Sequence, residues 1–152
     1  MSRNLLFRTA QSTLRQSFYK PSSSSPQIPF LRQFHITSPR MTVHTYDSAD
    51  AFKKAVQDNK VVLLDCFATW CGPCKAIAPI LTKHSNDEKF KDVHFAKIDV
   101  DDLPELAQEL GITAMPTFLL FKDGELTPAE KLVGANPNAL VKLLETNAPA
   151  AA

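Results

Sequence analysis

Hydrophobic residues between positions 43 and 147 recur in two patterns. Short runs that are apolar throughout are typical of strands buried on both faces of a sheet, and apolar residues three or four positions apart are typical of amphipathic helices. The run Val61–Ala68, apolar except for Asp65, is the clearest buried strand, and the sequence WCGPCK follows it closely. The patterns predict strands at 43–46, 61–68, 93–99, 117–122 and near 130–133, and helices at 48–58, 73–86, 103–111 and from Asn136–Pro137 onward.

The predicted elements follow the order β-α-β-α-β-α-β-β-α. Neighbouring parallel strands need a crossover connection, so the β-α-β arrangement of the first half indicates parallel strands. The pair Asp123–Gly124 is a hairpin signal, which indicates that the last two strands are antiparallel. We therefore expect an α/β fold, with a central mixed sheet of about five strands flanked on both faces by about four helices.

Residues 1–41 differ from the rest of the chain in charge. They hold six Lys and Arg residues and no acid, whereas residues 42–152 hold eleven basic and sixteen acidic residues. If the first eighteen residues become helical, their apolar side chains gather on one side, away from Arg8 and Arg15. An amphipathic, Arg- and Ser-rich segment without acids is the composition of a mitochondrial or chloroplast transit peptide.

The stretch Arg32–Met41 resembles the two-step processing pattern of matrix proteins, with Arg ten, Phe eight and Thr five residues before the final cut. The resemblance implies a first cut after Gln33 and removal of Phe34–Met41, which leaves Thr42 first. We expect residues 1–41 to be a disordered, cleaved mitochondrial transit peptide and 42–152 to be the folded matrix domain. Plastid targeting and an untargeted basic tail are the alternatives, and Met41 offers an internal start for a cytosolic form.

Composition excludes several other classes. No apolar run approaches the roughly 18 residues of a membrane span, and the longest in the first segment, Leu5–Phe7, is too short for a secretory signal. Three cysteines are too few for a disulfide-stapled scaffold. The acidic domain argues against nucleic acid as a partner, because phosphate backbones require clusters of Lys and Arg.

The sequence Trp70–Lys75, read WCGPCK, places two thiols two residues apart. A tetrahedral zinc site needs four ligands, but Cys66 lies inside an apolar strand and the four histidines are scattered singly. A structural disulfide between Cys71 and Cys74 would close too small a loop to constrain much. We therefore predict redox chemistry and no metal. The histidines are His35, His44, His84 and His94.

The pair lies where a buried strand ends and a helix begins. Free backbone N–H groups and the positive helix end stabilise a thiolate at such a position. We expect Cys71, at the exposed tip, to be the nucleophile and the shielded Cys74 to resolve the mixed disulfide. Asp65 lies in an apolar strand beside the pair, which favours a proton-transfer role over a paired structural acid.

The motif WCGPCK after a strand that ends in Asp-x-x-Ala-x-Trp resembles the thioredoxin family, and the resemblance covers residues 42–152 and none of 1–41. Asp65 matches the buried acid of the family, Lys97 the lysine that tunes it, and Pro79 the proline that kinks the helix. Met115–Pro116 matches the loop whose proline is cis and packs against the active-site sulfurs. The resemblance implies substrate contacts at Trp70, Gly72, Pro73, Met115, Pro116, Gly134 and Ala135.

Two positions depart from the family pattern. Cys66 stands where the family usually has a large apolar residue, and we interpret it as a small core hydrophobe, with a regulatory thiol as the alternative. Between Gly124 and Gly134 the chain is about two residues longer than the short family hairpin. Neither position belongs to the redox centre.

The resemblance implies a monomeric protein-disulfide reductase that binds no cofactor. Its electrons would come from NADPH through a flavin-containing thioredoxin reductase, and peroxiredoxins would be among its targets. The first alternative is an oxidase or isomerase on the same fold, but Pro73 stands where such oxidants usually carry His. The second is a binding module with a vestigial motif, which the matches at Asp65, Lys97 and Pro116 disfavour.

Overall fold

The computed structural model describes residues 42–149. Helices and strands lie close to the positions that the hydrophobic pattern predicts, and most boundaries agree within one or two residues. The one element not anticipated is a short 3-10 turn that buries Phe90. The elements are β1 Val43–Thr45, α1 Ala49–Asp58, β2 Val61–Phe67, α2 Gly72–Ser85, η1 Glu88–Phe90, β3 His94–Asp99, α3 Pro104–Glu109, β4 Thr117–Lys122, β5 Glu130–Val133 and α4 Pro137–Asn147.

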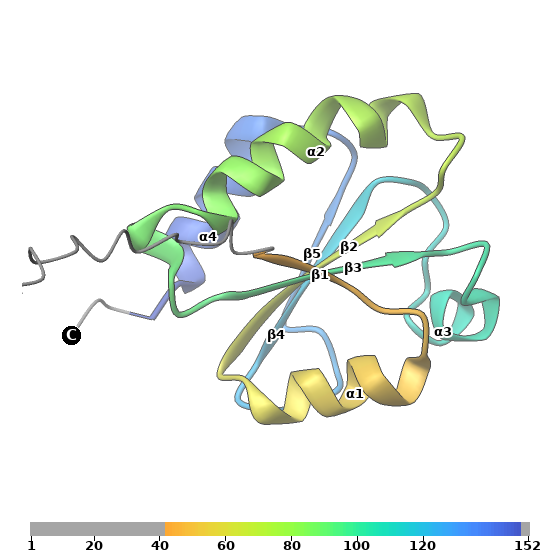
Figure 1. The fold of residues 1–152 in the computed structure, drawn as a ribbon, viewed down its shortest axis with the longest axis horizontal. Coiled ribbons are helices and arrows are strands. Elements are labelled where there is room, and N and C mark those ends of the chain that lie inside the picture. The colour runs from red at the N-terminus through yellow and green to blue at the C-terminus, as the bar shows by residue number, and fades with distance from the viewer. Residues whose placement is uncertain (1–41, 150–152) are drawn as a thin grey trace, which may run out of the picture. The chain divides into compact units, whose positions relative to one another are not determined.

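The strands form one five-stranded sheet in the order β1-β3-β2-β4-β5 (Figure 1). Strands β1 and β2 each pair in parallel with β3, because helical crossovers return the chain to the same end of the sheet. Strand β4 runs antiparallel to both β2 and β5. The mixed α/β sheet predicted from the sequence is therefore confirmed, and β2 occupies its centre.

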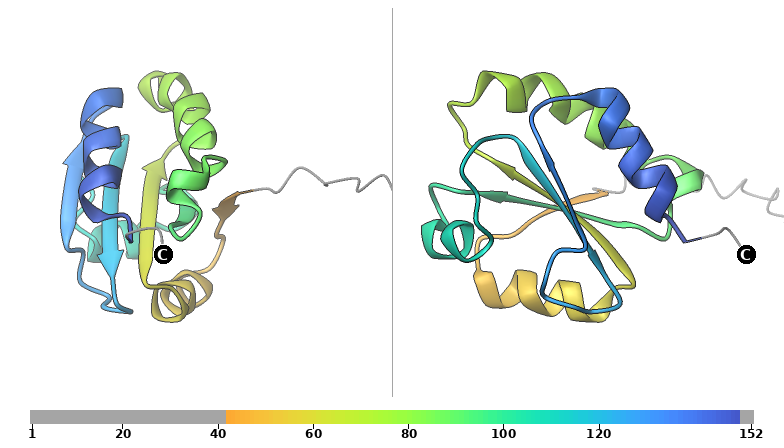
Figure 2. Two further views of the ribbon diagram at one scale, coloured as in Figure 1. Left: turned by 90° about the vertical axis from the view of Figure 1, so that its left-hand side faces the viewer. Right: turned by 180° about the vertical axis from the view of Figure 1, so that it is seen from behind.

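Two hydrophobic cores lie on the two faces of the sheet. Figure 2 shows that helices cover both of these faces. Helices α2 and α4 pack on one face and contribute residues such as Ile77 and Leu140. Helices α1 and α3 pack on the other and contribute residues such as Phe52 and Leu106. Alternate residues of β2 therefore enter opposite cores, which explains why this strand is apolar almost throughout.

The order of strands and helices determines where the two thiols lie. The carboxyl end of the central strand β2 leads directly into the amino end of α2, and the two thiols occupy that junction. Helix α2 continues through Pro79 and ends at Ser85, so the thiols lie at its amino end and its carboxyl end points away from them. None of the helices within residues 42–149 is both long and apolar enough to cross a membrane.

Candidate active site

Cys71 and Cys74 are joined by a disulfide at the first turn of α2. Cys71 is the N-cap residue of the helix, and its sulfur accepts a hydrogen bond from the backbone N–H of Cys74, at 3.2 Å. Pro73 occupies the first helical turn, where its missing N–H leaves no hydrogen bond unmade. The N–H of Cys74 and the amino end of α2 therefore lie beside the sulfur of Cys71, where they can stabilise a thiolate.

Both sulfur-bearing residues are buried, which corrects the expectation of an exposed Cys71. The exposed fraction is 5% for Cys71 and 4% for Cys74. In the disulfide state Cys71 lies against Cys74 and Ala68, and Val100 and Met115 pack against this group. A sequence pattern cannot anticipate that cover, because Val100 and Met115 come from separate segments of the chain.

Trp70 is the most exposed large hydrophobic residue described, at 66%. Its indole is nevertheless held, because Nε1 donates a hydrogen bond of 2.7 Å to Oδ2 of Asp101. The backbone N–H of Asp101 in turn donates to Oδ1 of Asp99, at 3.0 Å. Sequence reasoning missed both acids, and the only signal available was a run of acidic residues after the third strand.

Two loops that the sequence assigned to substrate binding meet beside the disulfide. The Met115–Pro116 peptide bond is cis, as the family resemblance implied, and Pro116 is buried. The backbone N–H of Gly134 donates to the carbonyl oxygen of Pro116, at 2.8 Å. Ala135 is exposed next to it, and Val133, which sequence reasoning did not single out, is 53% exposed.

Asp65 and Lys97 are neighbours across the sheet. They are register partners in the parallel pair β2–β3, so their side chains lie on the face of the sheet that α2 covers. Asp65 is only 3% exposed, and its Oδ1 atom has no hydrogen-bond partner among the described residues. A cavity of about 280 Å³ is lined by Asp65, Lys97 and Cys74, among others. The structure thus brings the acid and the second thiol to one cavity.

Burial controls the protonation of this acid. Removal from water disfavours the carboxylate and raises the pKa of Asp65 to about 7, while the charge of Lys97 acts in the opposite direction. The neighbouring Cys66 points into the opposite core and is fully buried. Burial, followed by the charge of Asp65, raises the pKa of the Cys66 thiol to about 12, so this thiol stays protonated.

Comparison with known proteins identifies the fold and the motif together. The family model Thioredoxin matches residues 43–146. Thioredoxin-2 of Pyricularia oryzae is 44% identical over 144 residues, which cover 95% of this chain and 80% of that protein, so the similarity extends into residues 1–41. Mitochondrial thioredoxin-3 of Saccharomyces cerevisiae is 41% identical over 125 residues, covering 82% of this chain and 94% of that protein.

Solved structures that resemble this chain lead to the same family. The thioredoxin of Malassezia sympodialis (Mala s 13) superposes with a TM-score of 0.68 at 41% identity, covering 76% of this chain and 99% of that one. A chain from work on thiol resolution in yeast mitochondrial 1-Cys peroxiredoxin by the glutathione and thioredoxin systems gives a TM-score of 0.63 at 40% identity, covering 68% and 94%. With this coverage and identity the chain belongs to the thioredoxin family, whose members reduce protein disulfides through a dithiol of this kind.

Proposed function

We propose that the mature protein is the mitochondrial matrix thioredoxin of its organism and that Cys71 and Cys74 exchange electrons with target disulfides in defined order. The observation that carries the proposal is the shared cavity, which holds the Asp65 carboxyl and Cys74 behind a disulfide at the start of α2. Such a cavity offers a path for a proton to leave a buried thiol.

In the first step the thiolate of Cys71 attacks one sulfur of the target disulfide. A Cys71–target bond forms, the target S–S bond breaks, and one target sulfur leaves as a thiolate that takes up a proton. The backbone N–H of Cys74 and the amino end of α2 favour negative charge on the attacking sulfur. Cys71, as the N-cap residue, is the member of the pair placed to use both.

In the second step Cys74 attacks the Cys71 sulfur of the mixed disulfide. The Cys71–Cys74 bond forms, the Cys71–target bond breaks, and the second target sulfur leaves as a thiolate that takes up a proton. The target then carries two added electrons and two protons. Cys74 must first lose its proton, and it is only 4% exposed to water. Asp65 is the base in reach through the cavity, directly or by one water, and Lys97 tunes its basicity.

Target chains dock on the surface that surrounds the disulfide. Trp70 and Val133 expose apolar side chains there, and the loop at Met115 and Pro116 packs beside the sulfurs. Gly72 and Pro73 are exposed, and neither carries a long side chain, so they leave room for a target chain to approach the sulfurs. Gly134 and Ala135 complete the docking surface at the start of the loop before α4.

Electrons reach the oxidised protein from NADPH through a thioredoxin reductase, and peroxiredoxins are among the targets. Thioredoxins need no bound cofactor for the exchange, because the two thiols carry the electron pair. The similarity to a chain from the yeast mitochondrial peroxiredoxin work supports this class of target.

Residues 1–41 act as a cleaved targeting segment, and residues 42–152 form the working thioredoxin. Support comes from the acid-free, Arg-rich composition of the segment and from the similarity to a mitochondrial thioredoxin of yeast. The pattern Arg32–Met41 places the final cut before Thr42.

Reduction of insulin by NADPH and a thioredoxin reductase tests the order of the two cysteines. Cys71→Ser should abolish reduction, because no attack begins. Cys74→Ser should lose multiple turnover but accumulate a mixed disulfide with insulin that dithiothreitol releases, since attack survives and resolution does not. Multiple turnover by Cys74→Ser, or a covalent adduct formed by Cys71→Ser, would reverse the assignment.

A further inference from the structure

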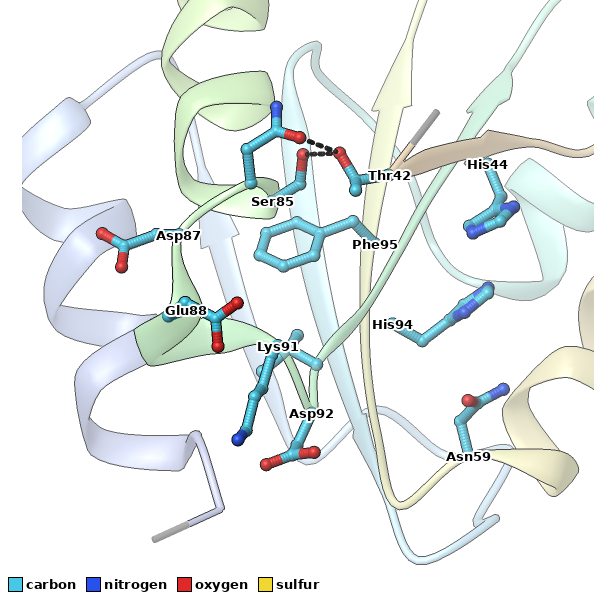
Figure 3. Close-up of a pocket in the computed structure, with 12 residues that line it drawn as sticks. Thr42, His44, Asn59, Ser85, Asp87, Glu88, Lys91, Asp92, His94 and Phe95 are labelled. Carbon is cyan, nitrogen blue, oxygen red and sulfur yellow. Dashed lines mark hydrogen bonds between the residues drawn. The ribbon is translucent and has the colours of Figure 1, made fainter. Parts of the chain in front are cut away.

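A large cavity of about 710 Å³ lies at the carboxyl end of α2, away from the disulfide (Figure 3). The imidazole rings of His44 and His94 stack at its border, with ring centroids 4.6 Å apart. Besides these histidines, its charged lining consists of three acids and one lysine, namely Asp87, Glu88, Asp92 and Lys91. This excess of negative charge disfavours an anion in the larger cavity.

The smaller cavity of about 280 Å³, at the amino end of α2, has the opposite charge balance. Two lysines, Lys75 and Lys97, line it against one acid, Asp65. Lys75 is exposed, whereas Lys97 is half-buried with its ammonium 5.5 Å from the centroid of the Phe67 ring. The lining therefore attracts an anion even when Asp65 is ionised, because one positive charge is in excess.

The acid in this cavity needs a hydrogen-bond partner. Oδ1 of Asp65 is buried and has none among the described residues, which is unfavourable for a polar group. Burial raises the pKa of Asp65 to about 7, so its protonated form is populated near neutral pH. A protonated carboxyl group donates one hydrogen bond, and beside two lysines the best acceptor for it is a carboxylate oxygen.

The rest of the lining is mostly apolar and short. These residues are Phe67, Ala68, Thr69, Cys74 and Ala78. At roughly 30 Å³ for each water, the cavity has room for several waters or for one compact organic molecule. Apolar walls around a few polar groups are typical of sites for small organic ligands.

We propose that this cavity binds a small organic monocarboxylate with a compact apolar body, for which benzoate is a suitable probe. The ligand carboxylate lies at Asp65 and Lys97, and its apolar body packs on Phe67 and Ala78. Lys75, which is exposed, attracts the anion at the entrance. The ligand carboxylate and Asp65 share one proton, which comes from solvent if Asp65 was ionised before binding.

This shared proton makes binding depend on pH. The other ionisable groups that face Asp65 are Lys97 from β3 and Lys75 from α2, since Cys74 is held in the disulfide. Two adjacent carboxylates repel each other, so the ligand selects the protonated form of Asp65. With a pKa of about 7, that form falls from about nine-tenths of the molecules at pH 6 to about one-tenth at pH 8.

Binding does not depend on the proposed function, but its effect on turnover rests on the proton path described above. A bound carboxylate would keep Asp65 protonated and would displace the water between Asp65 and Cys74. The second step of disulfide exchange should then slow, whereas attack by Cys71 should not. The cavity would thus be a site at which a small acid inhibits resolution of the mixed disulfide.

Titration of the oxidised full chain with benzoate, followed by NMR of the backbone amides, tests the site. Wild type should bind one benzoate at pH 6 with a Kd of about 1 mM or tighter, and roughly tenfold more weakly at pH 8. Amide signals around the smaller cavity should shift, and those around the larger cavity should not. Benzamide, which has a similar shape and no charge, should bind more weakly.

Variants of the lining test the contacts. Lys75→Met should weaken binding roughly threefold, as loss of an exposed charge does, and Ala78→Leu roughly tenfold or more, because its side chain fills the cavity. Lys91→Met in the larger cavity and Ala76→Leu, at an exposed position of α2 outside the lining, are matched controls that should bind as wild type does. Asp65→Asn should bind equally well at pH 6 and pH 8, because an amide donates at either pH.

The amide spectra verify that each variant is folded. Benzoate shifts confined to the larger cavity, or equal affinity in wild type and in folded Lys75→Met and Ala78→Leu, would overturn the proposal. Saturating benzoate should slow insulin reduction at pH 7 and leave alkylation of Cys71 in the reduced protein unchanged. Binding with unchanged insulin reduction would uphold the site and refute the proton path through Asp65, so the two failures are distinguishable.

Discussion

At the scale of single residues, Asp65 differs most from its surroundings. It is an acid in the central strand, almost fully buried, with one carboxylate oxygen that no described group satisfies. Burial of an unpaired polar group opposes folding, and here Lys97 offsets it only in part. Such an arrangement lowers stability, and it provides a base with a pKa of about 7 beside a buried thiol.

Asp65→Asn should stabilise the protein, and more so as pH rises. The folded-state pKa of Asp65 is raised from 3.8 to about 7, so the folded state holds its proton longer than the unfolded state. The stability of wild type therefore falls between about pH 4 and pH 7 and stays low above, by at most about 4 kcal/mol from this group. Urea melts over a pH series should show the variant gaining stability in that window and no gain below it.

The same variant should reduce insulin at least roughly tenfold more slowly at pH 7, because it lacks the carboxylate that we propose deprotonates Cys74. The rate of Cys71 alkylation by iodoacetamide, in the reduced protein, should change little and serves as the control. Unchanged turnover combined with lower stability would make Asp65 a structural residue instead.

Lys97→Gln should move the pH dependence of turnover without removing it. The charge of Lys97 lowers the pKa of Asp65, so its loss should raise that pKa further and shift the acid limb of the turnover profile toward higher pH. Insulin reduction measured from pH 5.5 to 9 checks the shift. An acid limb that stays in place, or moves to lower pH, would show that Lys97 does not tune this acid.

At the scale of elements, the working surface is made where secondary structures end. The disulfide caps α2, and the loop at Pro116 precedes β4. Gly134 follows β5 with a φ of 93°, a left-handed conformation that residues with a Cβ rarely adopt. Its N–H donates to the Pro116 carbonyl, so one unusual backbone position joins the two loops to which we assign target docking.

Gly134→Ala should weaken docking of protein targets through backbone strain alone, because an added Cβ would meet nothing within 4 Å. We expect a loss of about 1–2 kcal/mol in stability and a several-fold rise in KM for insulin. Asn136→Ala is the matched control. It removes the side-chain cap of α4, a 3.1 Å bond from the Ala139 N–H, and costs about 1 kcal/mol without touching the Gly134–Pro116 bond. Equal KM values for insulin in the two variants would show that Gly134 contributes to the stability of the fold and not to the docking of targets.

At the scale of the whole molecule, residues 42–149 form the complete five-stranded sheet with a core on each face. Thr42 is anchored to this unit, because its hydroxyl hydrogen-bonds Ser85 and Asn86 at the end of α2. A chain that begins at Thr42 would therefore retain every described element.

In cells the protein should be imported into mitochondria and trimmed to begin at or near Thr42. N-terminal sequencing of the protein from purified mitochondria measures this directly. Replacement of Arg32, the residue ten before the proposed final cut, should impair processing at this pattern. The imported protein should then keep extra residues before Thr42. Recovery of chains that begin at Met1 from the cytosol alone would refute both the targeting and the domain boundary.

The sequence by itself determined the elements, their order and the thiol pair. Burial imposes a local period on apolar residues, and Pro, Gly and Asp–Gly signals mark the ends, so these features are encoded over short stretches. The resemblance of the motif to thioredoxins then located Asp65, Lys97, Pro116 and Gly134, and the structure brings these residues to one end of the sheet around the disulfide.

Tertiary structure alone decided which distant residues meet. The bond from Trp70 to Asp101, the cover that Val100 and Met115 give the disulfide, and the stacking of His44 on His94 all join separate elements. Histidines that are scattered singly along the chain became a pair because β1 lies beside β3 in a fixed register. Strand order and register depend on how all the elements pack together, and no short stretch of sequence carries that information.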